Sequence, residues 1–149
     1  MSRLKNKVCI ITGAASGMGE SEALAFAQQG AKLVIADLNL EQANRVAAQI
    51  VTAGGEAFAC QVNVTELDQL QHLVEFSLEK FGRIDVLLNN AGVFDKYTNS
   101  LETSDELWNA MFDINVKSVF RLSNLVLPKM IEQGSGAIIN LSLIHISDG

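Results

Sequence analysis

The stretch Thr12-Gly13-Ala14-Ala15-Ser16-Gly17-Met18-Gly19 is the part of the sequence that decides the fold. It joins a β-branched run, residues 7–12, to a segment of helical periodicity that begins at Gly17. Small residues let a backbone approach a phosphate closely, and the free N–H groups at a helix start donate hydrogen bonds to it. A tight strand–helix turn without a ligand is the alternative. The context favours a nucleotide-binding loop.

Outward from this loop, short apolar runs alternate with helical patterns. The runs cover residues 7–12, 31–37, 56–62, 84–89 and 137–141, and the helical patterns cover 17–29, 40–52, 65–81 and 103–133. Continuous apolar strands are typical of a parallel sheet that is buried on both faces. Strands that alternate with helices indicate right-handed βαβ units. We therefore expect an α/β fold with a doubly wound parallel sheet.

Polar residues and glycines predict where the helices begin and end. The expected N-terminal caps are Asn39 with Gln42, Thr65 with Asp68, and Thr103 with Glu106. Gly30 and Gly134 are expected to end the first and last helices. Pro128 should kink the last turns of the long helix.

The composition excludes several classes of protein. The 149 residues fit one domain, and a net charge of -6 argues against a protein that binds nucleic acid. No run approaches the roughly 20 apolar residues of a membrane span, and the basic N-terminus lacks a signal peptide's apolar stretch. Cys9 and Cys60 have no metal-binding or redox spacing, so no metal site is expected. We expect buried thiols in a cytoplasmic protein.

A carboxylate follows the loop at the distance that a dinucleotide site requires. Asp37 ends the second apolar run, 24 positions after Gly13, where it can accept both ribose hydroxyls of an adenosine. A 2′-phosphate ~4 Å away would be repelled by about 4 kcal/mol at an effective dielectric near 20. No basic residue lies between Gly13 and Lys32, and Leu38 follows Asp37. The sequence favours NAD over NADP, with an exposed helix-capping aspartate as the alternative.

Two other strand ends supply amides and small residues. Asn63 follows the third run, where its amide can pair with an adenine edge while Val64 packs on the ring. Asparagine is equally a turn residue, so this signal is weak by itself. The fourth run ends in Asn89-Asn90-Ala91-Gly92, which leaves room for a sugar or nicotinamide. These amides can hold either the loop or a ligand at the carboxyl edge, where open α/β sheets bind ligands.

Together these motifs resemble the short-chain dehydrogenase/reductase family. The resemblance covers residues 5 to about 141 and rests on Thr12-Gly13-x-x-x-Gly17-x-Gly19, Asn89-Asn90-Ala91-Gly92 and Asp113-Ile114-Asn115-Val116. It implies a Rossmann-like sheet of about five strands in the order 3-2-1-4-5, with the C-terminal strands missing. It also implies hydride transfer between NAD and a small-molecule alcohol or ketone. By this resemblance the NAD site contains Gly13, Ser16, Gly17, Met18, Gly19, Asp37, Leu38, Asn63, Val64, Asn90, Ala91 and Gly92, and Asn115 holds a water in the proton relay.

The chain departs from the family at its catalytic residues. The family's tyrosine has a lysine four residues later that lowers its pKa from near 10. Here Tyr97 is the only tyrosine, and leucine stands four residues after it. The family's second serine after the fifth strand is also absent, because Leu143 follows Ser142. We expect Tyr97 to be a loop or surface residue and the chain to be catalytically incompetent.

The end of the sequence and the long helix carry two further expectations. Residues 141–149 resemble the translation of a transposon-end adapter used to prepare sequencing libraries, with an unusual natural ending as the alternative. We therefore expect an incomplete NAD-binding Rossmann domain over residues 1–140 and a non-native tail over residues 141–149. Apolar residues lie on more than one side of helix 103–133, which predicts either a homo-oligomer or plain core packing.

Two other functions compete with an oxidoreductase. A non-catalytic dinucleotide-binding or sensor protein would share the loop and the carboxylate. A methyltransferase that uses S-adenosylmethionine would share them too, but the three-residue gap after Gly13 and the Asn89-Asn90-Ala91-Gly92 motif disfavour it.

Overall fold

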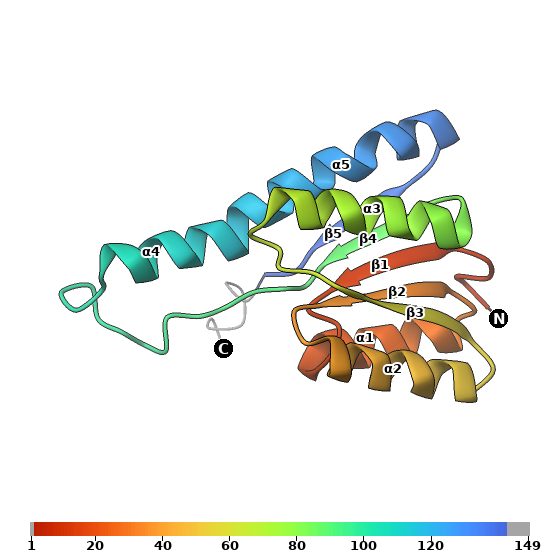
Figure 1. The fold of residues 1–149 in the computed structure, drawn as a ribbon, viewed down its shortest axis with the longest axis horizontal. Coiled ribbons are helices and arrows are strands. Elements are labelled where there is room, and N and C mark those ends of the chain that lie inside the picture. The colour runs from red at the N-terminus through yellow and green to blue at the C-terminus, as the bar shows by residue number, and fades with distance from the viewer. Residues whose placement is uncertain (1, 143–149) are drawn as a thin grey trace.

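The computed structural model describes residues 2–142, which fold into five strands flanked by helices (Figure 1). In chain order the elements are β1 (Val8–Thr12), α1 (Gly17–Gln28), β2 (Lys32–Asp37), α2 (Leu40–Thr52), β3 (Glu56–Gln61), α3 (Leu67–Phe81), β4 (Val86–Asn89), α4 (Asp105–Phe112), the π-helical turn η1 (Asp113–Lys117), α5 (Ser118–Gln133) and β5 (Ala137–Asn140). Most of the expected tail, residues 143–149, lies outside the described part of the chain.

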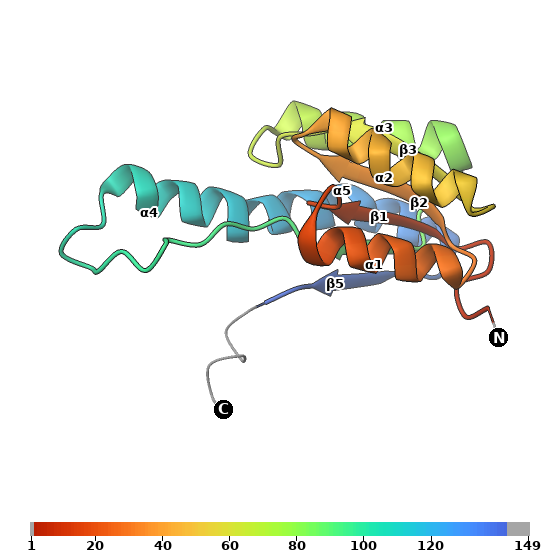
Figure 2. The ribbon, with the colours of Figure 1, turned by 90° about the horizontal axis from the view of Figure 1, so that it is seen from below.

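The sheet has the predicted topology. All four strand pairs are parallel, and the order is β3-β2-β1-β4-β5. The chain winds outward from β1 through β2 to β3, then returns to the centre and winds outward again through β4 to β5. Figure 2 shows β3 and β5 at the two edges. Because the winding reverses between β1 and β4, a crevice forms beyond the carboxyl ends of these strands.

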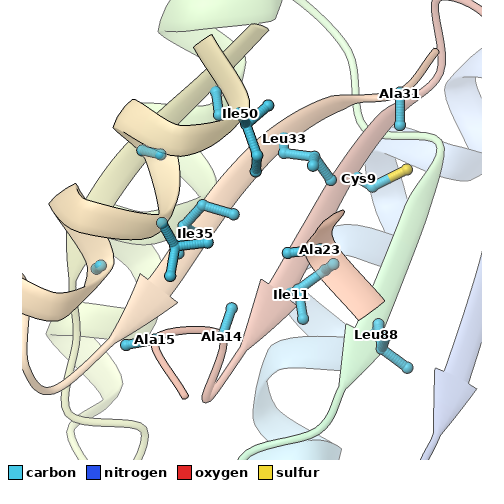
Figure 3. Close-up of a cluster of buried hydrophobic side chains, with 14 of the residues drawn as sticks. Cys9, Ile11, Ala14, Ala15, Ala23, Ala31, Leu33, Ile35, Ile50 and Leu88 are labelled. Carbon is cyan, nitrogen blue, oxygen red and sulfur yellow. The ribbon is translucent and has the colours of Figure 1, made fainter. Parts of the chain in front are cut away.

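Both faces of the central strands β1, β2 and β4 are buried, as their continuous apolar runs predict, whereas β5 is largely exposed. Helices α1 and α2 cover one face, and α3 and α5 cover the other (Figure 1). Figure 3 shows Cys9, Ile11 and Leu33 packed together on the first face, whereas Ile10 and Val34 face the second cluster. Neighbouring residues along a strand point to opposite faces, so β1, β2, β3 and β4 each supply both clusters.

Helices α3 and α4 each begin one residue later than the sequence suggests. The residue before α3 is Glu66, which makes no side-chain capping bond. Thr65 is not the cap because its hydroxyl donates to Oδ1 of Asn63 at 2.9 Å. Ser104, rather than Thr103, caps α4 through its side-chain oxygen. At α4 the adjacent hydroxyl residues Thr103 and Ser104 give nearly the same sequence signal, so the pattern alone does not select between them.

The long helix expected over residues 103–133 is interrupted. A π-helical turn, η1, separates α4 from α5, although Figure 1 shows the three segments as one continuous rod. Pro128 lies inside α5 without ending it, and Gly134 ends α5 in the left-handed region at φ 69°. A π turn inserts one extra residue without a change in hydrophobic pattern, so periodicity alone does not predict it.

Both cysteines are buried and unbridged. Burial, with a smaller contribution from the nearby Asp85 charge, raises the pKa of the Cys9 thiol to about 12 against the opposing effect of Lys7. Burial also raises the pKa of Cys60. A thiol reacts through its thiolate form, so burial disfavours reaction at both positions. Within residues 2–142, no helix is long and apolar enough to cross a membrane.

Candidate functional site

A cleft of about 390 Å³ opens beyond the carboxyl ends of the central strands. It is bounded by the loop after β1, the end of β2, the exits of β3 and β4, and the π turn η1. The lining residues are Gly13, Ser16, Met18, Gly19, Asp37, Leu38, Val62, Asn63, Val64, Asn90, Ala91, Gly92, Val93 and Ile114. The structure thus brings five separate segments of the sequence to one cleft.

Every residue predicted for a dinucleotide site lines this cleft except Gly17, which begins α1 at φ 57° with open space where a Cβ would be. Three lining residues were missed by the sequence analysis. Val62 is 1% exposed and has the pattern of a core residue. Val93 follows the Asn89–Gly92 motif directly, and Ile114 lies inside the Asp113–Val116 motif. Their position beside or inside these motifs is the sequence signal that could have identified Val93 and Ile114 as lining residues.

The glycine loop is packed so tightly that one position excludes any side chain. A Cβ at Gly19 would overlap the carbonyl oxygen of Gly13 and Nδ2 of Asn90. Gly13 itself has φ 63°, and its own Cβ would lie 2.9 Å from Cα of Ala91. The glycines therefore let the first turn of α1 approach both its own loop and the exit of β4.

Thr12 and Asn90 join the loop to the β4 exit. The Thr12 hydroxyl accepts hydrogen bonds from the backbone N–H groups of Asn90, at 3.2 Å, and Ala91, at 3.0 Å. In return, Nδ2 of Asn90 donates to the carbonyls of Thr12, at 3.0 Å, and Gly13, at 3.1 Å. The Asn90 amide thus holds the loop, which resolves one alternative that the sequence left open. The buried hydroxyl of Thr12 was missed because threonine is common in strands.

Asp37 is oriented by two backbone groups. Its Oδ2 accepts from the N–H of Ala15 at 3.0 Å, and its Oδ1 accepts from the N–H of Asn39 at 2.9 Å. Asn39, not Asp37, is the N-cap of α2, since its side chain accepts from the N–H of Gln42 at 3.1 Å. A carboxylate has about four acceptor positions, so two remain at Asp37 for a ligand.

A basic residue that the sequence analysis overlooked lies beside the loop. Arg45, on α2, donates to the Ala15 carbonyl at 3.3 Å and to both carboxylate oxygens of Glu20 at 2.9 Å. This hydrogen bonding lowers the pKa of Glu20, which stays ionised. The bidentate pair neutralises the carboxylate that Glu20 brings to the first turn of α1. Arg45 is 30 residues from Ala15 in sequence, so no local motif revealed the contact.

Asn63 acts as a turn residue, which is one of the two roles expected for it from the sequence. Its Oδ1 accepts from the backbone N–H of Thr65 at 3.1 Å and from the Thr65 hydroxyl at 2.9 Å. Its own N–H donates to Oε1 of Gln69 at 2.7 Å. The side-chain oxygen of Asn63 is therefore bonded within the turn, and Nδ2 is the side-chain atom that a ligand would meet.

Asn115, in η1, holds the loop that follows β4. Its Oδ1 accepts from the N–H of Val93 at 2.8 Å, and its Nδ2 donates to the Val93 carbonyl at 2.7 Å. The neighbouring Ile114 lines the cleft, whereas Asn115 does not. With both ends of its amide bonded to Val93, the side chain fixes the position of the cleft wall.

Tyr97 lies in the exposed loop before α4. It is 94% exposed, has φ 62°, and its ring stands edge-on to Phe94 with centroids 5.9 Å apart. The sequence prediction of a loop or surface position is thus confirmed. Leu101, where a lysine would complete a Tyr-x-x-x-Lys element, is 97% exposed. Neither residue lines the cleft.

Comparison with known proteins gives a consistent set of relatives. The profile of a family described as short chain dehydrogenase matches residues 7–145. A 3-oxoacyl-[acyl-carrier-protein] reductase of Thermotoga maritima is 39% identical over 142 residues, covering 95% of this chain and 57% of the relative. A cyclohexanol dehydrogenase of an Acinetobacter species is 39% identical over 143 residues, covering 96% of this chain and 57% of the relative.

Solved structures agree with these relatives. A 7α-hydroxysteroid dehydrogenase complexed with NADH and 7-oxoglycochenodeoxycholic acid has a TM-score of 0.87 at 39% identity, and the match covers 91% of this chain and 52% of that one. A metagenomic short-chain oxidoreductase in complex with NADP has a TM-score of 0.91 at 31% identity, covering 98% and 66%. The chain thus spans little more than half the length of the curated relatives it matches.

Proposed function

The chain belongs to the short chain dehydrogenase family, and on that premise we propose that it supplies the dinucleotide-binding part of an NAD-dependent oxidoreductase. The parent enzyme would transfer a hydride between nicotinamide and a small-molecule alcohol or carbonyl compound. The observation that carries the proposal is the single cleft in which the glycine loop, Asp37 and the exits of β3 and β4 meet. When bound, NAD supplies the hydride-accepting ring.

Different residues of the cleft are proposed to contact different parts of the dinucleotide. The pyrophosphate would lie at the start of α1, where Gly17, Met18 and Gly19 supply helix N–H groups. Ser16 makes no side-chain capping bond, so its hydroxyl remains available to a phosphate oxygen. The remaining residues would enclose the two nucleosides: Asp37 and Leu38 the adenosine ribose, Asn63 and Val64 the adenine, and Asn90, Ala91 and Gly92 the nicotinamide side.

Replacing Asp37 by asparagine tests the preference for NAD. We expect the wild-type chain to bind NADH at least about 100-fold more tightly than NADPH, because the carboxylate repels a 2′-phosphate. In Asp37→Asn the ratio should fall below about tenfold, because the charge is lost while an acceptor is kept. Fluorescence titration with both cofactors measures the ratio.

Asp105→Asn is the matched control. It removes an equal charge from the first turn of α4 and should leave the ratio of NADH to NADPH affinity unchanged. Equal affinity of the wild-type chain for NADH and NADPH would contradict the proposal.

Catalysis is proposed to need residues that positions 1–149 do not contain. The Tyr-x-x-x-Lys element is absent from the sequence, so no phenol is placed to exchange a proton with a substrate oxygen. Asn115 is proposed for the family's water-holding role, and its bonds to Val93 would position that wall of the site. The chain should therefore show no loss of NADH absorbance with cyclohexanone. Measurable turnover would contradict this proposal.

A non-catalytic dinucleotide-binding or sensor protein is the second candidate, favoured by the same missing Tyr-x-x-x-Lys element. We favour the enzyme-derived chain over this sensor. We propose that residues 1–140 form an incomplete NAD-binding Rossmann domain and that residues 141–149 are non-native. The encoding DNA separates the two candidates. Adapter identity over codons 141–149 supports the enzyme-derived chain, and a natural stop codon without such identity supports the sensor.

The exposed side of α4 and α5 is proposed to bind a second copy of the chain. Trp108, Phe112 and Phe120 are exposed there, while Leu122 and Val126 are buried against the sheet. A single apolar stripe suffices for the sheet, so the second stripe suits a partner helix. Sedimentation should show a dimer or larger species for the wild-type chain and a monomer for Phe120→Glu. A monomeric wild-type chain would contradict this.

The buried, unbridged thiols support a cytoplasmic location.

A further inference from the structure

Arg121, in the first turn of α5, reaches across to the turn that follows β3. Its Nη1 donates a hydrogen bond to the Thr65 carbonyl at 3.0 Å, although the two residues are 56 positions apart in sequence. Thr65 follows Asn63 and Val64, which both line the cleft. Helix α5 therefore contacts the cleft wall through a charged side chain as well as through apolar packing against α3.

Arg121 binds the carbonyl of Thr65, the residue whose N–H and hydroxyl orient the Asn63 side chain. The N–H and the hydroxyl of Thr65 both donate to Oδ1 of Asn63, at 3.1 and 2.9 Å. The N–H of Glu66 donates to the Asn63 carbonyl at 3.0 Å. These local bonds set the internal shape of the turn, and Gln69 supports it from α3. The bond from Arg121 is different, because it sets where the turn stands relative to α5.

The same helical rod also holds the opposite wall of the cleft. Asn115, six residues before Arg121, binds both backbone polar groups of Val93. One continuous element, η1 followed by α5, thus contacts the exit of β4 at one residue and the exit of β3 at another. Both side chains thus connect a wall of the cleft to the same helical rod.

We propose that Arg121 is a positioning residue for the adenine end of the dinucleotide site. The proposal rests on the proposed function, since it assigns the adenine to the Asn63–Val64 turn. A guanidinium donor bonded to a neutral carbonyl makes a charge-assisted hydrogen bond, stronger than the neutral bonds within the turn. Its loss should let the turn move as a unit without unfolding the sheet.

The test compares ligand affinities of the full chain and its variants. Arg121→Met keeps the length and apolar stem of the side chain and removes its donors. We expect it to weaken NADH and AMP by the same factor, about tenfold, because the affected contacts are those of the adenine half. Arg121→Lys, which keeps a charged donor, should lie between Arg121→Met and wild type. Lys129→Met removes a charge from the exposed part of α5 and should change neither affinity.

Amide hydrogen exchange gives a second measurement that needs no ligand. In Arg121→Met the N–H groups of Thr65 and Glu66 should exchange at least about tenfold faster, while those of β2 keep their rates. Unchanged exchange at Thr65 and Glu66 would overturn the positioning role, as would unchanged AMP affinity. If the wild-type chain binds no NADH, the proposed function fails, and the exchange rates then decide the role of Arg121 alone.

Discussion

Gly19→Ala is expected to destabilise the chain by about 3 kcal/mol and to abolish measurable NADH binding. The new Cβ would overlap the Gly13 carbonyl oxygen and Nδ2 of Asn90, both of which are held in place. Nδ2 of Asn90 already donates to the carbonyls of Thr12 and Gly13, so neither partner moves without the loss of these bonds. The loop would have to move away from the β4 exit, and the part of the cleft lined by this loop would be lost.

Gly82→Ala is the matched control for this substitution. Gly82 ends α3 at φ 73° with open space at the Cβ position, so its cost is conformational, about 1 kcal/mol. It lies outside the cleft, and NADH affinity should be unchanged. Urea unfolding and NADH titration of both variants test the expectation. A Gly19→Ala chain that keeps the wild-type free energy of unfolding would contradict the packing described here.

Asp85→Ala is expected to lower the free energy of unfolding by about 3 kcal/mol without touching the cleft. The Asp85 side chain is 3% exposed. It accepts from Nε and Nη2 of Arg83, at 2.8 and 2.6 Å, and from the buried N–H of Val8 at 2.9 Å. Alanine would leave the Val8 N–H buried without its partner. Asp113→Ala, which removes an exposed pair with Lys117, should cost less than about 0.5 kcal/mol.

The same carboxylate gives the stability a defined pH dependence. Burial raises the pKa of Asp85, but Arg83, the Val8 N–H and Lys7 together outweigh it and hold the pKa below its usual value. Stability from a lowered carboxyl pKa is present above the unfolded value, near 3.9, and is lost as the pH falls through the folded value. Urea unfolding from pH 7 to pH 3 should therefore show a shallower acid loss in Asp85→Ala than in wild type. Parallel losses would contradict this.

The fold was largely predictable because its signals are local. The glycine loop, the apolar runs and the helical periodicities each occupy a few consecutive residues, and parallel connections allow few topologies. Cap positions shifted by one residue in two helices: Ser104 replaces its neighbour Thr103 at α4, and the Thr65 hydroxyl before α3 is bonded to Asn63 instead. The π turn was not predictable, because Asp113–Lys117 keeps the same apolar pattern as a regular helix.

The sequence predicted most residues that line the cleft, but not the contacts between them. Motifs placed Asp37 and Asn90 at one sheet edge, because the carboxyl ends of parallel strands coincide. The bonds that hold this edge join distant segments: Thr12 to Asn90, Arg45 to Ala15, and Arg121 to Thr65. Such pairs leave no trace in local spacing. They become visible only when the fold brings the segments together.

A titration of the isotopically labelled chain with NADH, followed by backbone amide NMR, tests the central claim most directly. Saturable shifts are expected at residues 13–19, 37–38, 63–64 and 90–93, four of the five segments that line the cleft. These shifts should reach half their amplitude at one common NADH concentration. Absence of saturable shifts, or shifts confined to α4 and the loop before it, would contradict the proposal that this cleft binds the dinucleotide.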